Sequence, residues 1–316
     1  MFAIFLSIAV CIGGQGSRPG VVDIGVFYMP REAAELARMV EGNPGGKKAF
    51  SLALAPLVRG EKEDWEPYLK AAARHDSFRV VLDVHVCAGK EWTEGDRLRE
   101  LLTRVMSSPH ASQVGGWLLT DEPFGRSRPE RKNPTDVARI VDVLRIVREV
   151  DPKGTVFSDY AATAPLEERD GRRRRFLWNG EWVHEAKVPG GATITPRFGA
   201  FGEDIVLLNW WEDARSLKRW LPRITKEVKP SQIVPVVGWD WTPRSDRADA
   251  QYLERIKEII AVADKAGVRG YWFWPWQDIP IPSQKRDYKG VAGFWEDGPK
   301  RSKTRRRYAH LVESLR

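Results

Sequence analysis

Cysteine and histidine are scarce in this sequence of 316 residues, which contains two cysteines and five histidines. Cys11 lies in a segment that we expect to be removed, so Cys87 would be the one cysteine left. One cysteine forms no intrachain disulfide and supports no cysteine-ligated metal site. The histidines are dispersed along the chain, whereas a zinc hydrolase needs them clustered. We predict no cofactor and no metal site, with a calcium or magnesium ion held by carboxylates left open.

Glycine-rich phosphate-binding turns and long apolar runs are missing as well. The residues Tyr28-Met29-Pro30-Arg31 follow the first predicted strand and include no glycine to hold a phosphate, so the sequence disfavours nucleotide binding. The apolar run 1–14 is too short to span a bilayer and is followed by small and turn-forming residues. This pattern is typical of a secretory signal peptide. We therefore expect a signal peptide over 1–16, a barrel domain over 17–316, no membrane span, and a secreted or periplasmic protein.

Acidic residues are outnumbered by basic ones, which gives a formal net charge of +8 and a pI near 9.5. The basic residues are scattered except for two runs, at 172–175 and 300–307. Such runs usually form solvated faces, and no zinc-finger, helix-turn-helix or RNA-binding signature accompanies them. We predict no nucleic-acid partner. A basic surface protein that binds anionic polymers would require both runs to lie on one face, which their expected positions disfavour.

What the sequence does contain is eight units that alternate along the chain, each with a short buried-strand pattern and all but one with an amphipathic helical pattern. The predicted strands are 23–28, 50–56, 78–86, 116–120, 155–158, 204–209, 233–238 and 270–274. The predicted helices are 31–40, 61–74, 96–106, one that starts at Asn133-Pro134, 216–228, 246–266 and 301–315. Strict alternation of eight such units favours a single closed (β/α)8 TIM barrel, of class α/β, over a doubly wound sheet.

Strand five is followed by a stretch, 161–202, in which no clear helix pattern is visible. Within it, 176–178 and 181–183 flank Asn179-Gly180, a dipeptide typical of two-residue hairpin turns. We predict a β-hairpin insertion here that replaces or precedes a reduced helix.

Active sites of (β/α)8 barrels lie at the carboxyl ends of the strands, so the residues at these ends are the candidates. In this chain, with its 14 tryptophans, many of them are polar or aromatic. The candidates for binding substrate are Tyr28, Asp83, His85, Asp121, Asp159, Asn209, Trp210, Trp239, Trp272 and Trp274. Carboxylates provide the acid, base and nucleophile of glycoside chemistry, and indole rings offer apolar faces to sugars. Their coincidence on several strands predicts a carbohydrate site.

The most specific motif is GWLLTDEP at 116–123, where strand four ends. It resembles the glycoside-hydrolase-like barrels, in a large clan of which strand four ends in Asn-Glu-Pro and the Glu is the acid/base. The resemblance implies that Glu122 protonates the leaving oxygen and that Asp121 replaces the Asn that contacts the sugar 2-hydroxyl. This Asp is a departure from the clan, and a second carboxylate beside Glu122 would favour protonation of one of the two. Alternatively, Asp121 caps a helical turn entered through Pro123 and leaves Glu122 merely exposed.

The same resemblance directs attention to strand seven for the partner of Glu122. In that clan a Glu closes strand seven, whereas this sequence has Asp240 there. We predict Asp240 as the second catalytic carboxylate, with Asp83, Asp159 and Asp278 as rivals. Its shorter side chain would widen the separation of the pair, so retention and inversion both stay open.

Strand eight resembles the aromatic end of the same clan. Trp274 matches the tryptophan that floors the cleavage subsite, and Trp276 is its rival. Trp272 alternatively packs inside the barrel, because side chains alternate between the two faces of a strand.

Together these features predict a glycoside hydrolase that acts on a carbohydrate polymer or oligosaccharide through a pair of carboxylates. The alternative is a non-catalytic barrel that binds glycans, because a fold does not imply activity. The enzyme needs Glu122 and a partner carboxylate across the mouth, whereas the binding protein needs only the aromatic platform. The basic balance also permits an acidic sugar, contacted by Arg126, Arg128 and Arg131.

Overall fold

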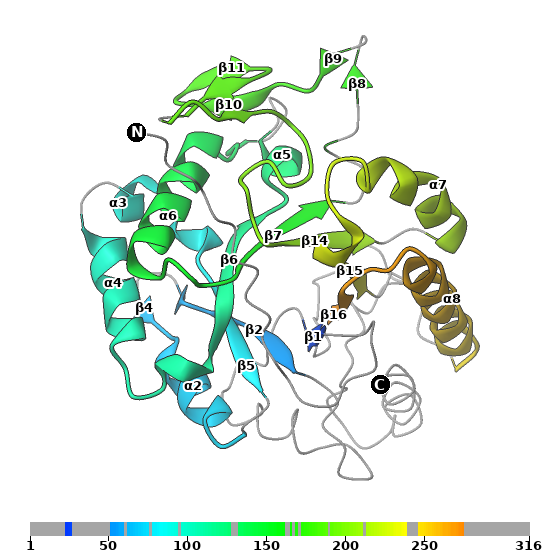
Figure 1. Ribbon diagram of the computed structural model, residues 1–316, viewed down its shortest axis with the longest axis horizontal. Helices are drawn as coiled ribbons and strands as arrows, with labels where there is room; N and C mark the ends of the chain where they lie inside the picture. The colour runs from blue at the N-terminus through cyan, green and yellow to red at the C-terminus, as the bar shows by residue number, and fades with distance from the viewer. Residues whose placement is uncertain are drawn as a thin grey trace, which may run out of the picture.

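Eight parallel strands close into a barrel in the computed structural model (Figure 1). In chain order they are β1 (Asp23–Val26), β2 (Leu52–Pro56), β5 (Arg79–Asp83), β6 (Val114–Asp121), β7 (Val156–Ala161), β14 (Ile205–Trp210), β15 (Ile233–Gly238) and β16 (Gly270–Trp274). Strands β1 and β16 complete the closure by pairing with each other. The structure describes residues 23–26, 51–59, 62–75, 78–93, 96–127, 132–161, 165, 168–169, 172–188, 190–210, 213–238 and 246–274. Each strand overlaps a predicted one, so the predicted (β/α)8 barrel is confirmed.

Helices lie on the outside of the barrel, as Figure 1 shows for α4, α6, α7 and α8. The α-helices are α2 (Glu66–Ala72), α3 (Lys90–Thr93), α4 (Arg97–Met106), α5 (Pro123–Arg126), α6 (Val137–Val150), α7 (Ala214–Ile224) and α8 (Asp246–Lys265). Short 3-10 helices are η1 (His85–Cys87), η2 (Ala111–Gln113) and η4 (Pro230–Gln232). The predicted helices 31–40 and 301–315 lie outside the described residues. None of the helices within the described ranges combines the length and the hydropathy needed to cross a bilayer.

Two predicted helix starts are wrong. Helix α6 begins at Val137, because the Asp136 carboxylate caps it by accepting a hydrogen bond from the Ala138 amide, at 3.1 Å. The Asn133-Pro134 pair lies before this cap. Helix α2 starts at Glu66, later than expected, because β3 (Val58–Arg59) and β4 (Lys62–Glu63) pair as a small hairpin in front of it.

The core has two apolar layers, as expected for a closed barrel surrounded by helices. Inside the barrel, Leu54, Val81, Leu118, Phe157 and Trp272 belong to one buried cluster. Alternate residues of the same strands, such as Val80 and Leu119, point the other way and pack beneath the helices. The inner apolar layer lies below the carboxyl ends of the strands and supports the polar residues there.

The insertion between β7 and β14 contains paired strands. Strands β10 (Phe176–Trp178) and β11 (Glu181–Val183) are antiparallel, at the residues that the sequence places on either side of Asn179-Gly180. Both turn residues have positive φ, 50° for Asn179 and 83° for Gly180, as a type I′ turn requires. The other pairs are β8 (Glu168–Arg169) with β9 (Arg172–Arg173), and β12 (Ala186–Lys187) with β13 (Thr193–Ile194).

No α-helix is found among the described residues between β7 and β14, so other side chains cover this part of the barrel. Phe124 of α5 stacks on Phe201 with ring centroids 5.9 Å apart, and it meets the edge of Phe176. The hairpin is tied to the site-bearing loops by the Leu177 amide, which donates to the Ser127 hydroxyl at 2.7 Å. The insertion therefore holds the short helix α5, which directly follows Glu122.

Candidate active site at the carboxyl end of the barrel

A β-bulge in β6 sets the geometry of the predicted site. Leu118 pairs with Phe157 of β7, but the next pair joins Thr120 to Ser158, so β6 carries one extra residue. An extra residue reverses which side chains beyond it face the barrel interior. As a result Asp121 pairs with Asp159, two strand positions above the inward Phe157. Both carboxylates are buried, with 7% of Asp121 and none of Asp159 exposed.

Glu122 leaves the strand in an unusual backbone conformation. Its φ of 52° and ψ of 54° lie in the left-handed region, which a non-glycine residue rarely adopts. Its amide donates to the carbonyl of Asp159 at 2.8 Å, so the residue remains tied to β7. Glu122, and not Asp121, is the residue directly before α5, and its side chain makes no capping bond.

The side chain of Glu122 is half-buried beside the first turn of α5. A Cβ atom placed on Gly125 would lie 3.6 Å from Oε2 of Glu122 and 3.8 Å from the Cβ of Ala161. The carboxylate thus lies near the α5 turn and the end of β7. This position is at the carboxyl end of the barrel, where the chemistry of this fold takes place.

Asp159 of β7 has a hydrogen-bond partner on β14, the neighbouring strand on the side away from β6. Asn209 of β14 donates from Nδ2 to Oδ2 of Asp159 at 2.6 Å, and only 6% of Asn209 is exposed. A carboxylate with no solvent exposure needs such hydrogen bonds, because burial without a partner costs several kcal/mol. The bond fixes the orientation of Asp159 beneath the mouth of the barrel.

Asp83 and His85 form a second fixed pair. Asp83 ends β5, and its Oδ1 accepts hydrogen bonds from the His85 amide, at 3.0 Å, and from the His85 ring at Nδ1. A ring nitrogen that donates to a carboxylate leaves Nε2 as the acceptor of a neutral imidazole. The two hydrogen bonds to Asp83 therefore hold His85 in one orientation at the end of β5.

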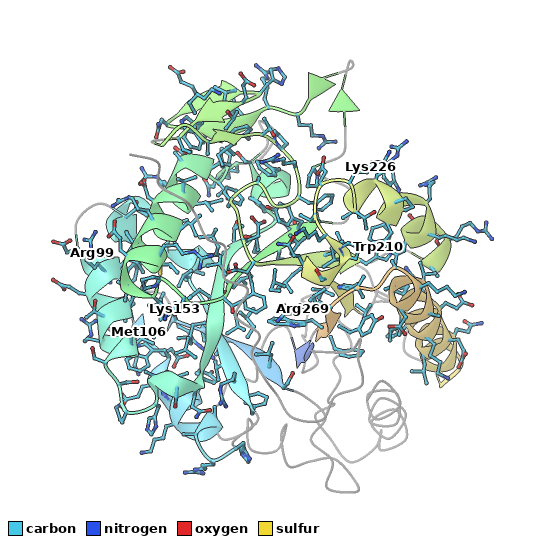
Figure 2. The ribbon with its side chains drawn as sticks, in the orientation of Figure 1. Arg99, Met106, Lys153, Trp210, Lys226 and Arg269 are labelled. Carbon is cyan, nitrogen blue, oxygen red and sulfur yellow. The ribbon has the colours of Figure 1, made fainter. Side chains whose placement is uncertain are left out.

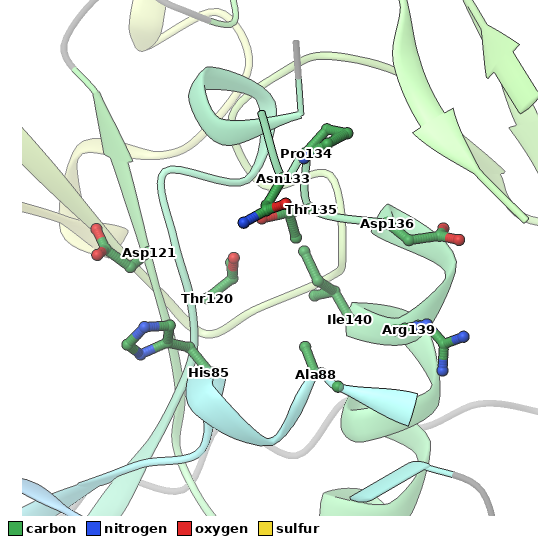
Figure 3. Close-up of a pocket in the computed structure, with 11 residues that line it drawn as sticks. His85, Ala88, Thr120, Asp121, Asn133, Pro134, Thr135, Asp136, Arg139 and Ile140 are labelled. Atoms are coloured by element: carbon green, nitrogen blue, oxygen red, sulfur yellow. The ribbon is translucent and has the colours of Figure 1, made fainter. Parts of the chain in front are cut away.

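A cavity of about 310 Å³ opens next to these residues (Figure 3). Figure 3 shows it between the end of β6, with Thr120 and Asp121, and the first turn of α6, with Asp136, Arg139 and Ile140. His85 lines it from η1. Such a volume accommodates a small ligand, and most of the lining side chains are polar.

The sequence analysis did not include Thr120, Asp136 or Arg139 among the candidates. Their one sequence signal is position, because they end strand four or begin the helix that follows it. The shape of the cavity depends on how this helix packs, which sequence spacing does not give.

Two of the predicted substrate-binding tryptophans are directed away from the mouth. Trp210 is 1% exposed and lies on the helix side of the barrel, where its Nε1 donates to the carbonyl of Asp213 at 3.2 Å (Figure 2). Trp272 is completely buried inside the barrel, 5.6 Å from Phe157 between ring centroids. We therefore no longer count Trp210 as a substrate contact, and Trp272 adopts the packing position that the sequence left open.

Several predicted residues lie outside what the structure describes. These are Asp240, Tyr28, Trp239, Asp278, Trp276, Arg128 and Arg131. For Trp274 and Arg126 the structure describes the backbone only. The basic run 300–307 is also outside it, so its position relative to 172–175 stays a prediction. Across the described ranges, no group of three or more His, Cys, Asp or Glu side chains is arranged to hold a metal ion.

The sequence has no match among protein family models or among curated proteins. Its fold is similar to solved glycoside hydrolases. An exo-β-1,4-mannosidase from Opitutaceae bacterium strain TAV5 has a TM-score of 0.60 and 15% identity, over 93% of this chain and 59% of the mannosidase. Xylanase 10B from Thermotoga petrophila has a TM-score of 0.56 and 14% identity, over 93% and 94% of the two chains.

A β-glucosidase from Thermotoga maritima is also similar, with a TM-score of 0.52 and 10% identity over 95% of this chain and 99% of the glucosidase. The chain spans less than two thirds of the mannosidase but nearly the whole of the other two enzymes. At these identities the likeness concerns the fold. In its fold, the chain is therefore similar to the barrels of these glycoside hydrolases.

Proposed function

We propose that the chain is a secreted or periplasmic glycoside hydrolase that cleaves a carbohydrate polymer or oligosaccharide, with Glu122 as its general acid/base. The observation that carries the proposal is the left-handed backbone of Glu122 directly after the bulge in β6. A strained non-glycine residue costs about 1–3 kcal/mol and persists where function requires it. Here it occurs at the strand end that carries the Asp-Glu-Pro motif.

In the proposed reaction, the Glu122 carboxyl donates its proton to the oxygen of the leaving sugar. A second carboxylate then stabilises the oxocarbenium-like centre, as a nucleophile or by activating a water. Asp240 remains our candidate for this role. Two rivals already have structural partners, since Asp159 is completely buried against Asn209 and Asp83 accepts two hydrogen bonds from His85.

The polar residues of the cavity beside His85 suit the recognition of sugar hydroxyl groups. Figure 3 shows Thr120, Asn133 and Thr135 around it. Hydroxyl groups both donate and accept hydrogen bonds, so they match the hydroxyl and amide groups of this lining. A non-catalytic glycan-binding barrel is less well supported, because Trp210 and Trp272 are buried and do not contribute to an aromatic platform.

The test is hydrolysis of a panel of aryl glycosides and glycans, including uronic-acid types, by the wild type and by Glu122→Gln. The substitution keeps the shape of the side chain and removes its proton, so we expect turnover to fall by about 10²–10⁴-fold. Glu100→Gln is the control, because Glu100 is exposed on α4, outside the site. Glycan binding without turnover by the wild type would favour the non-catalytic barrel, and unchanged turnover by Glu122→Gln would exclude Glu122 as the acid.

A further inference from the structure

Helix α7 and the turn after it present a basic face to the outside of the barrel. Its members are five exposed residues, Arg215, Lys218, Arg219, Arg223 and Lys226. Their spacing along the helix places them on one side. The buried residues Leu217, Leu221 and Ile224 occupy the opposite side. Figure 2 shows the side chains of α7 extending away from the barrel, with Lys226 near the end of the helix.

Among the described residues, this basic face differs from helices α4, α6 and α8 in having no neutralising partners. Within the described part of the chain, no ion pair joins any of its five residues to a carboxylate. By contrast, Arg99 of α4 pairs with Glu149 of α6 at 2.7 Å, and Lys257 of α8 pairs with Glu254 at 2.7 Å. Unpaired charges of one sign create a positive potential that attracts an anionic ligand.

Two acidic residues described next to the basic face are engaged by backbone amides. Asp213 caps α7 and accepts a hydrogen bond from the Ser216 amide at 2.7 Å. Glu227 accepts one from the Phe198 amide at 2.9 Å. Neither carboxylate forms an ion pair with the basic face within the described residues.

Trp220 brings two of the guanidinium groups together. The Arg223 group lies over its ring at 4.8 Å from the centroid, and the Arg219 group lies at 5.4 Å. Two guanidinium groups at one indole offer neighbouring fork-shaped donors that match carboxylate or sulfate groups. Because they cover the ring, Trp220 is not a free platform for stacking bases, on which single-stranded nucleic acid depends.

The position of α7 connects the basic face to the mouth of the barrel. The helix follows β14 directly, and β14 carries Asn209 at its carboxyl end. Trp210 then donates to the carbonyl of Asp213, the residue that caps α7. The helix therefore starts at the rim of the barrel, and the eight steps from Arg215 to Arg223 extend about 12 Å along the outer wall at 1.5 Å per residue.

We propose that the basic face of α7 binds an acidic polysaccharide, a polymer that bears carboxylate or sulfate groups, and holds it beside the mouth. Its link to the mouth rests on the proposed function, whereas the binding itself does not. The polymer is favoured over nucleic acid because the face offers charge and fork-shaped donors without an open stacking surface.

The test measures binding of a fluorescein-labelled oligogalacturonate by fluorescence polarisation at about 50 mM salt, where surface charges are weakly screened. We expect the double charge reversal Arg219→Glu with Arg223→Glu to weaken binding by about tenfold or more. Each contact between a cationic side chain and an anionic group of the polymer contributes to the salt-dependent affinity, as phosphate contacts do in nucleic-acid binding. Lys218→Glu with Lys226→Glu is a second, independent variant that keeps the residues around Trp220. Lys70→Glu with Lys265→Glu is the control, since both lysines are exposed on other helices.

Four outcomes overturn the proposal. They are unchanged binding by the α7 variants, an equal loss in the control variant, no measurable binding by the wild type, and displacement of the probe by single-stranded DNA at a lower concentration of anionic groups. A neutral xylan oligosaccharide should not compete. The same measurement on Glu122→Gln should give unchanged binding. A wild type that binds the probe through α7 but hydrolyses no glycan would refute the proposed function alone, and an active wild type whose binding does not depend on α7 would refute this proposal alone.

Discussion

Asp121 of β6 and Asp159 of β7 occupy paired positions on neighbouring strands because β6 contains one extra residue between Leu118 and Asp121. Without the bulge, the side chain of Asp121 would lie on the helix side of the barrel with Leu119. The bulge also brings the Glu122 amide within 2.8 Å of the Asp159 carbonyl. A local irregularity in one strand thus positions the two acidic residues of the strand-four motif.

Asn209 should be required for the stability of the buried Asp159 carboxylate. Asn209→Ala removes the donor and is expected to lower the free energy of unfolding by about 1–3 kcal/mol. Asn209→Asp places two carboxylates where the hydrogen bond now spans 2.6 Å. At about pH 8 it should therefore lower the free energy of unfolding by more than Asn209→Ala does. Urea unfolding at about pH 8 and about pH 5 measures both. The deficit of the Asp variant should shrink on acidification, because protonation of one carboxylate removes the repulsion; a deficit independent of pH would contradict this account.

Asp83 and His85 should act as a unit. A double-mutant cycle with Asp83→Asn and His85→Ala is expected to give a coupling free energy of about 0.5–3 kcal/mol, because each substitution removes the same hydrogen bond. The cycle is measured by thermal or urea unfolding and needs no substrate. Kinetics on a glycoside that the protein hydrolyses then show whether the orientation of the His85 ring matters for turnover. If it does, Asp83→Asn should lower kcat/KM although His85 is still present. Additive effects in the cycle would mean that the pair is not coupled.

Gly116 should tolerate no side chain. Its φ is 147°, and a Cβ atom there would meet the Thr155 carbonyl and lie 2.6 Å from Cε2 of Phe157. Gly116→Ala is therefore expected to cost more than about 2 kcal/mol of unfolding free energy. Gly190→Ala is the matched control, since Gly190 also has positive φ, 98°, but has open space around it, so its cost should be about 1 kcal/mol. Equal costs for the two variants would show that the contacts of Gly116 do not limit the packing of β6.

Glu203 should make the stability of the protein depend on pH. Burial raises the pKa of this carboxyl above 4.5, and the Tyr160 hydroxyl donates to it at 2.5 Å. The folded protein then holds the proton more tightly than the unfolded chain does. The free energy of unfolding should therefore decrease as pH rises from about 4.5 through the raised pKa of the folded state.

Two substitutions examine this buried pair. Glu203→Gln should flatten the decrease of stability with pH, because the titrating group is gone. Tyr160→Phe removes the donor and should cost about 1–3 kcal/mol at neutral pH. Urea unfolding across the acid range measures both. A slope that Glu203→Gln leaves unchanged would assign the pH dependence to another group.

The eight strands and their order could be predicted from the sequence because each strand is short and apolar, and all but strand five are followed by a helical pattern. Barrel closure follows from this alternation with no further information, since parallel strands need crossover helices between them. The hairpin turn could also be predicted from adjacent residues alone, because Asn179 and Gly180 both tolerate the positive φ that it requires. The strand-four motif also made Glu122 a candidate without knowledge of its surroundings.

The direction of individual side chains was harder to predict. In β14, alternation from the inward Leu207 already places Asn209 inside and Trp210 outside the barrel. For β6 the same rule fails at the bulge, since the extra residue is recognisable only from the pairing with β7. The start of α6 was also misplaced, because Asn133 and Asp136 are both suitable caps and the tertiary contacts of Asp136, which also accepts from the Asn179 amide at 3.0 Å, decide between them.

The sequence by itself thus determined the barrel, its strand order and the acidic motif at 116–123, because these depend on local periodicity and residue type. The tertiary structure alone decided that Asp121 faces Asp159, that Asp83 orients His85, and that a cavity opens between β6 and α6. It also decided that the charges of α7 are left without partners among the described residues. These features depend on which strands and helices meet, and contacts between distant segments are set by packing rather than by sequence spacing.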